Sequence, residues 1–84
     1  MSVDAASEHG KTIDKLVYMA NQISKFFLSQ GDAVAVTGTA EHIKNFWDPR
    51  MLKAIFAHLD KGGAGLEPVA GQAIEQLQKA AVKA

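Results

Sequence analysis

The chain has 84 residues, fewer than the ~100–150 typical of one domain, so it is too short for a two-domain enzyme. Hydrophobic residues make up 48% of the sequence and charged residues 21%, a balance that favours a folded protein over a disordered one. Nine basic and nine acidic residues give a net charge of zero, which argues against a nucleic-acid partner because nothing compensates the phosphate charges.

The chain contains no cysteine, which excludes disulfides, thiolate zinc sites, iron–sulfur ligation and cysteine nucleophiles. Its first residues, MSVDAASEHGK, have neither the basic nor the apolar region of a signal peptide. No apolar run approaches the ~20 residues that span a bilayer. We therefore expect a cytoplasmic protein that does not enter a membrane.

The chain divides into a short polar segment and one domain. Residues 1–11 are mostly small and polar, and we predict that they form a mobile N-terminal arm. Residues 12–84 are predicted to form a single helical domain, an all-α bundle of three to four short helices with short connections.

The first predicted helix extends from Thr12, which can cap it, to Gln30, and Gly31 can end it. Apolar residues recur there with helical spacing, at Ile13, Leu16, Val17, Ala20, Ile23 and Phe27. Met19, Phe26 and Leu28 widen this stripe to about half of the helix circumference. One face of the helix is therefore available for a partner.

A second helix is predicted between Asp32 and Trp47, although Val34 and Gly38 weaken it. The residues expected on its inner line are Ala33, Val36, Ala40, Ile43 and Trp47, with Phe46 beside them. The run Ala33–Val36 also suits a strand. We favour the helix because no second run of β-branched residues could pair with such a strand.

Two further helices have clear start signals. Asp48 can cap a third helix in which Pro49 takes the first position, and Gly62–Gly63 can end it. Its expected inner residues are Leu52, Ile55, Phe56 and Leu59. Glu67–Pro68 can open a fourth helix with inner residues Val69, Ala73, Ile74, Leu77 and Ala81, and with Glu75 and Lys79 spaced for an ion pair.

The sequence contains no recognisable catalytic, cofactor-binding or metal-binding set. None of His9, His42 and His58 lies four residues from another histidine, the spacing that places two metal ligands on one helix face. The run Lys61–Gly65 lacks the preceding strand and following Lys–Ser/Thr of a phosphate loop. The hydroxyls of Ser24, Ser29 and Thr39 have no histidine–carboxylate pair placed to activate them.

The residues available for protein contacts belong to two groups, the aromatic pairs and the residues around Arg50. In each of the pairs Phe26–Phe27 and Phe46–Trp47, one ring can enter the core, which we assign to Phe27 and Trp47. The other ring fits either the core edge or an interface. Arg50, the only arginine, is either an exposed residue paired with Asp48 or a bidentate contact to a partner. The full set of candidate partner-binding residues is Phe26, Phe46, Arg50, Met51, Ala54 and Ala57, the two alanines forming a flat strip beside Arg50.

Three segments together resemble one known family. They are MANQISKFF at Met19–Phe27, FWDPRM at Phe46–Met51 and AHLDKGGAGLEP at Ala57–Pro68. In this order they are similar to the delta subunit of NAD-dependent, molybdenum-containing formate dehydrogenases. The resemblance carries Trp47, Asp48, Pro49 and Arg50 as a signature, to which we add Gly62 and Gly63 as structural residues at a helix end.

The resemblance implies a small, non-catalytic subunit that stabilises the complex or assists its assembly by binding the catalytic alpha subunit. It also implies that the molybdenum–pterin cofactor, the iron–sulfur clusters, FMN and NAD are bound by the larger subunits, with none in this chain. Two alternatives remain. One is a transient maturation factor that visits the catalytic subunit while the pterin–metal cofactor is inserted. The other, an enzyme in its own right, is disfavoured by the missing catalytic set.

Overall fold

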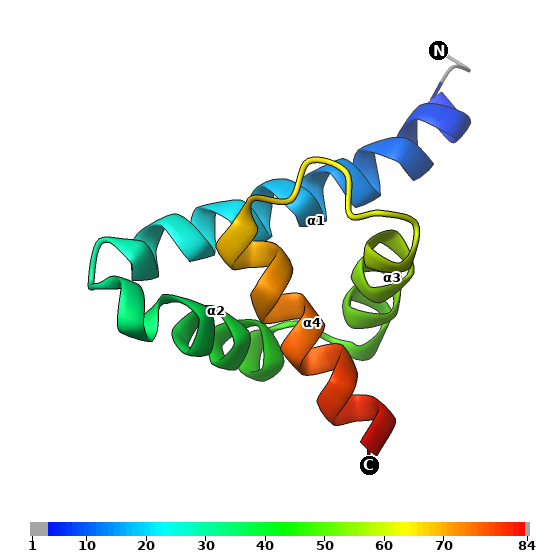
Figure 1. Cartoon of the computed structure of the whole chain (residues 1–84). Helices are drawn as coiled ribbons and strands as arrows, with labels where there is room; N and C mark the ends of the chain where they lie inside the picture. The colour runs from blue at the N-terminus through cyan, green and yellow to red at the C-terminus, as the bar shows by residue number, and fades with distance from the viewer. Residues whose placement is uncertain (1–3, 84) are drawn as a thin grey trace.

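The computed structural model describes the backbone of residues 4–83 and the side chains of residues 12–81. Within that range the chain forms α1 (Asp4–Leu28), α2 (Asp32–Phe46), α3 (Pro49–Asp60) and α4 (Pro68–Lys83), and no strand (Figure 1). The predicted all-α fold is thus confirmed. After α1, the chain reverses into α2, and α4 packs against α1, α2 and α3. None of the helices in the described part is long and apolar enough to cross a membrane.

The first helix is longer than predicted. It begins at Asp4, so the predicted start at Thr12 is wrong, and residues 4–11 of the expected arm are helical, while residues 1–3 lie outside the described residues. Residues 4–11 contain no proline and include several good helix formers, and each residue added to an existing helix gains one hydrogen bond. At the other end, α1 stops at Leu28, two residues before the predicted end at Gln30. Gly31 does not cap α1 as predicted, because it lies three residues beyond the helix and is the N-cap of α2; its φ of 131° is a backbone conformation that favours glycine.

All four helices contribute to one hydrophobic core. Its buried members are Leu16 and Ala20 from α1, Ile43 from α2, Trp47 after α2, Ile55 from α3, and Ala70 and Ile74 from α4. The side chain of Trp47 is only 6% exposed, which confirms its predicted place in the core. Leu52, Phe56 and Leu59, the other predicted inner residues of α3, pack against this cluster.

The buried face of α2 differs from the predicted line. Ala33 is exposed, whereas Ala35 and Thr39 are fully buried. The difference arises from tertiary packing. Because α2 packs against both α1 and α4, it buries a wider part of its circumference than a helix that packs against one neighbour. Gly38 permits the close approach of α1, since a Cβ atom at Gly38 would lie 2.5 Å from the ring of Phe27.

The predicted ends of α3 and the start of α4 are confirmed. The Asp48 carboxylate accepts a hydrogen bond of 2.9 Å from the Met51 backbone N–H, and Pro49 takes the first helical position. Gly62 and Gly63 follow α3 with φ of 113° and 64°, values that favour glycine. In α4 the prediction of inner residues is wrong at Ala81, which is exposed in the last turn, where α4 projects beyond the other helices (Figure 1).

Candidate partner-binding surface

Large apolar side chains lie exposed on one side of the α1–α2 pair. Phe46, at the end of α2, is 73% exposed, and Tyr18 and Phe26 on α1 are 63% and 58% exposed. Tyr18, Gln22 and Phe26 are spaced four residues apart, so they follow one another along one face of α1. Both phenylalanines predicted from the sequence as partner-binding residues are thus accessible.

Ring contacts connect the two helices across this surface. The ring of Phe26 meets that of Phe27 edge-on at 5.0 Å between centroids, and Phe27 lies 6.3 Å from the imidazole of His42. His42 in turn lies 4.6 Å from the ring of Phe46. Such contacts hold the rings in defined orientations. We call these four residues, Phe26, Phe27, His42 and Phe46, the aromatic row.

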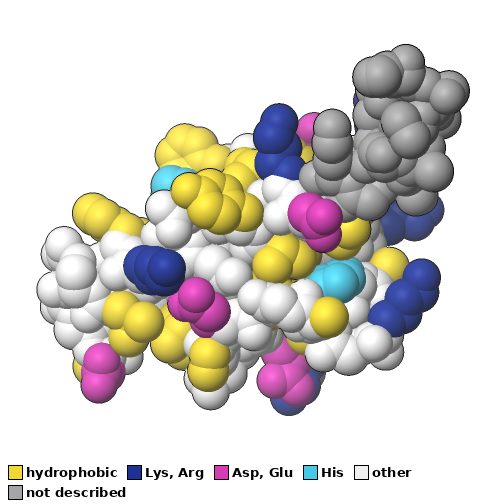
Figure 2. Space-filling model, turned by 90° about the horizontal axis from the view of Figure 1, so that it is seen from above, with side chains coloured by type: hydrophobic (Ala, Val, Ile, Leu, Met, Phe, Trp, Pro, Cys, Tyr) yellow, Lys and Arg dark blue, Asp and Glu magenta, His cyan; other side chains and the backbone are white. Residues whose placement is uncertain are grey.

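A shallow groove of about 370 Å³ adjoins the aromatic row and is called here the α1–α2 groove. None of the residues that line it is an aspartate, glutamate, lysine or arginine; they are Tyr18, Met19, Gln22, Ile23, His42, Phe46, Trp47 and Met51. In Figure 2, hydrophobic side chains gather beside a histidine at the upper left, and a basic side chain lies at the edge of this group. The groove therefore suits an apolar binding partner better than a charged one.

The remaining candidate residues lie on α3 and behave differently from one another. Arg50 and Ala57 are exposed, and Arg50 makes no ion pair with Asp48, whose carboxylate caps α3 instead. Met51 lines the α1–α2 groove. Ala54 departs from the expected flat strip, because it is half-buried and packs against the core. The structure thus brings Phe46, Trp47 and Met51 together in the lining of one groove. Ala54 does not line this groove and contributes to the core instead.

The segment between α3 and α4 is fastened to α1 by a residue that the sequence pattern did not reveal. The Asn21 side chain donates a hydrogen bond of 2.9 Å to the Gly65 carbonyl and accepts one of 2.9 Å from the Glu67 backbone N–H. His58 bonds the Ala64 carbonyl at 2.8 Å from within α3. The two Asn21 bonds join two of the three family-like segments, and no local sequence pattern marks Asn21 as the residue that forms them.

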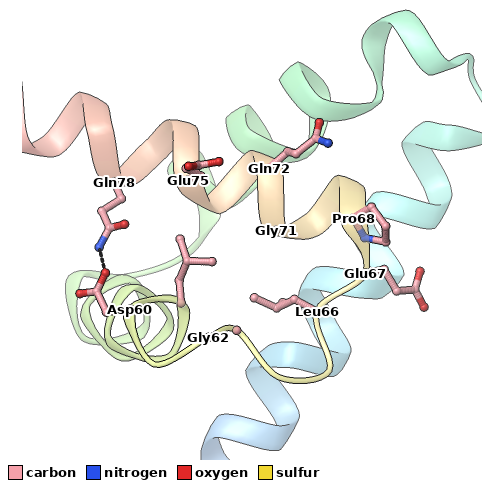
Figure 3. Close-up of a pocket in the computed structure, with 11 residues that line it drawn as sticks. Asp60, Gly62, Leu66, Glu67, Pro68, Gly71, Gln72, Glu75 and Gln78 are labelled. Atoms are coloured by element: carbon pink, nitrogen blue, oxygen red, sulfur yellow. Dashed lines mark hydrogen bonds between the residues drawn. The ribbon is translucent and has the colours of Figure 1, made fainter.

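A second hollow, of about 490 Å³, lies between the end of α3, the following loop and α4 (Figure 3). Asp60, Glu67 and Glu75 contribute carboxylates, and no lysine or arginine is among the lining residues. The Asp60 carboxylate already accepts a hydrogen bond of 2.9 Å from the Gln78 amide across the hollow. Glu75 pairs with Lys79 at 3.8 Å, the helical ion pair predicted from its spacing.

None of the hydroxyls considered above as nucleophiles has a histidine as its hydrogen-bond partner in the described part of the chain. Ser24 and Ser29 each donate to a backbone carbonyl three residues earlier, at 2.8 and 2.6 Å. Thr39 is fully buried, and its hydroxyl has no hydrogen-bond partner among the described residues. In the same part of the chain, no group of three or more His, Cys, Asp or Glu side chains is placed to hold a metal ion.

Comparison with protein families identifies the family of the chain. Residues 15–74 match the family model described as NADH-dependent formate dehydrogenase delta subunit FdsD. The match includes most of α1, all of α2 and α3 and the first part of α4, and so it spans both the α1–α2 groove and the loop fastened by Asn21. Comparisons with curated proteins and with solved structures give no match.

Proposed function

Because the chain belongs to the family of NADH-dependent formate dehydrogenase delta subunits, we propose that it stabilises that complex, or assists its assembly, by binding the catalytic alpha subunit. Family membership makes it an accessory subunit that associates with other formate dehydrogenase subunits. The observation that carries the finer proposal is the pair of exposed phenylalanines, Phe26 and Phe46, beside a groove that no aspartate, glutamate, lysine or arginine lines.

The physical support for this proposal is the unfavourable free energy of exposing apolar side chains to water. Burying apolar surface stabilises an association by about 25 cal/mol per Å², and aromatic side chains often dominate binding energy at interfaces. Phe46 exposes 73% of its surface in the free chain, so most of that gain is still available. A net charge of zero also gives the free chain little self-repulsion to keep it from associating.

We propose further that the chemistry belongs to the other subunits. A chain without cysteine has no thiolate ligand for an iron–sulfur cluster. On this proposal the molybdenum–pterin cofactor, the iron–sulfur clusters, FMN and the NAD site are held by the larger subunits, and this chain contributes binding energy alone. The isolated chain is then expected to give no NADH from formate and NAD.

The test is co-expression of this chain with the remaining formate dehydrogenase subunits, followed by purification through a tag on the catalytic subunit. A constant one-to-one ratio of this chain to the catalytic subunit in the mature complex is the expected result. Loss of the chain once the pterin–metal cofactor is inserted would indicate a transient maturation factor instead. Failure of the chain to associate with the catalytic subunit at any stage would contradict both roles.

A further inference from the structure

The shape of the α1–α2 groove specifies more than an apolar partner. Its rims are formed by exposed side chains of two neighbouring helices, Tyr18 and Gln22 from α1 and Phe46 from α2. Its most buried lining residue is Trp47, which is 6% exposed. Met19, Ile23 and Met51 are only half-buried although they pack against the core, so they are open on the groove side. The groove is therefore open to a partner along the α1–α2 pair.

Among secondary-structure elements, a helix fits the α1–α2 groove best. Helices pack at interaxial distances of about 8–10 Å, with the side-chain ridges of one in the grooves of the other. Residues 12–81 offer no strand edge to which a partner strand could add. Tyr18 and Gln22, the α1 residues of the rim, are four positions apart, about 6 Å or one turn along a helix.

The lining decides the chemistry of that helix. No aspartate, glutamate, lysine or arginine lines the groove, so a charged side chain of the partner would be buried there without a carboxylate, ammonium or guanidinium group to pair with, which is strongly unfavourable. The unbranched side chains of Met19 and Met51 can adapt to the shape of apolar side chains placed against them. The face in contact must therefore carry apolar residues at the i, i+3 or i+4, and i+7 positions.

We infer that the α1–α2 groove receives one amphipathic helix of the catalytic alpha subunit, which lies between Tyr18 and Phe46 with its apolar face on Trp47. The inference rests on the proposed function, since it takes the occupant from the complex that the family defines. The helix completes a packing layer that α1 and α2 leave open, as a third helix does in a bundle.

The test places the photo-crosslinking amino acid benzoylphenylalanine at Tyr18 or at Phe46 in the full chain, co-expressed with the other subunits. The control position is Val34, which is 48% exposed on α2 but does not line the groove. We expect Tyr18 and Phe46 to cross-link to one segment of the catalytic subunit, at sites three, four or seven residues apart. Val34 should give no cross-link to that segment.

The same positions are tested by truncation, with affinity for the purified catalytic subunit as the readout. Tyr18→Ala and Phe46→Ala should each weaken binding at least tenfold, as expected for aromatic anchors, and Val34→Ala should change it less than twofold. Circular dichroism checks that each variant remains helical.

The possible failures are distinct. Cross-links to alternate residues of an extended segment, cross-links to a second copy of this chain, or no cross-link in an assembled complex would each overturn the helix inference and leave the proposed function standing. Unchanged affinity of both truncated variants would do the same. If the wild-type chain does not bind the catalytic subunit, the proposed function fails and the inference fails with it.

Discussion

Thr39 shows how a single atom can cost stability in a small core. Its side chain is fully buried, and its hydroxyl has no hydrogen-bond partner among the described residues. A buried polar group without a partner costs about 1–3 kcal/mol. Thr39→Val keeps the branched shape and replaces the hydroxyl by a methyl group, so we expect the free energy of unfolding to rise by about 1 kcal/mol.

Urea unfolding followed by circular dichroism measures this change. Thr39→Ser is the matched variant, because it keeps the hydroxyl and removes the methyl group, and it should lower stability. A loss of stability in Thr39→Val would mean that the hydroxyl is hydrogen-bonded in solution.

Arg50 is a residue whose exposure leaves it free to bind a partner. It lies next to Met51 of the α1–α2 groove and makes no ion pair within the described part of the chain. If it contacts the catalytic subunit through its planar guanidinium, Arg50→Ala should weaken binding about tenfold or more, and Arg50→Lys should restore it only in part.

Lys53→Ala, an exposed basic residue of α3, is the control for loss of charge and should bind nearly as the wild type does. Arg50 would instead be a structural residue of the α3 start if Arg50→Ala lowered the melting temperature and left binding unchanged.

Asn21 links residue and element, because one side chain fixes a whole loop. Removing its two bonds to Gly65 and Glu67 in Asn21→Ala should lower the free energy of unfolding by about 1–3 kcal/mol, because each hydrogen bond contributes about 0.5–1.5 kcal/mol. The Glu67 amide should also exchange its hydrogen faster. Gln22→Ala, at the exposed neighbouring position, is the control and should leave that exchange rate unaltered.

At the scale of elements, the sequence was sufficient to predict the helix boundaries that depend on local chemistry. The faces that the helices bury could be predicted only in part. Asp48, Pro49, Gly62 and Gly63 act on their own backbone, so their sequence positions were sufficient to place both ends of α3. The burial of Ala35 depends on α1 and α4, which the periodicity of α2 does not contain. The bond from Asn21 to Gly65 spans 44 positions, beyond any local pattern.

Gly38 is the clearest case in which tertiary contact opposes helix propensity. Alanine is about 1 kcal/mol better than glycine inside a helix, yet a Cβ at Gly38 would lie 2.5–2.9 Å from atoms of the Phe27 ring. Overpacking typically costs about 1–3 kcal/mol, so we expect Gly38→Ala to destabilise the chain on balance.

Gly71 of α4 provides the control, because a Cβ there would meet no atom within 4 Å. Gly71→Ala should therefore raise the melting temperature while Gly38→Ala lowers it. Equal shifts in both variants would show that the contact with Phe27 relaxes at little cost.

For the molecule as a whole, the core and the proposed docking surface share one side chain. Trp47 belongs to the core cluster and also forms the floor of the α1–α2 groove, whereas its neighbour Phe46 contributes only to the surface. A domain of this size has a folding free energy of only about 3–5 kcal/mol, and truncating a buried tryptophan typically costs as much. The free Trp47→Ala chain should therefore be largely unfolded.

Binding to the catalytic subunit stabilises only the folded form, but Trp47→Ala also removes the indole that the partner helix covers, so helical structure should return only at a higher concentration of that subunit than the wild-type chain requires for binding. Phe46→Ala should behave differently, with an unchanged melting temperature of the free chain and weakened binding. Melting curves with and without the catalytic subunit separate the two effects. A free Trp47→Ala chain that melts like the wild type would show that the core is held by Ile43, Ile55 and Ile74 without the indole, and that Trp47 acts at the interface alone.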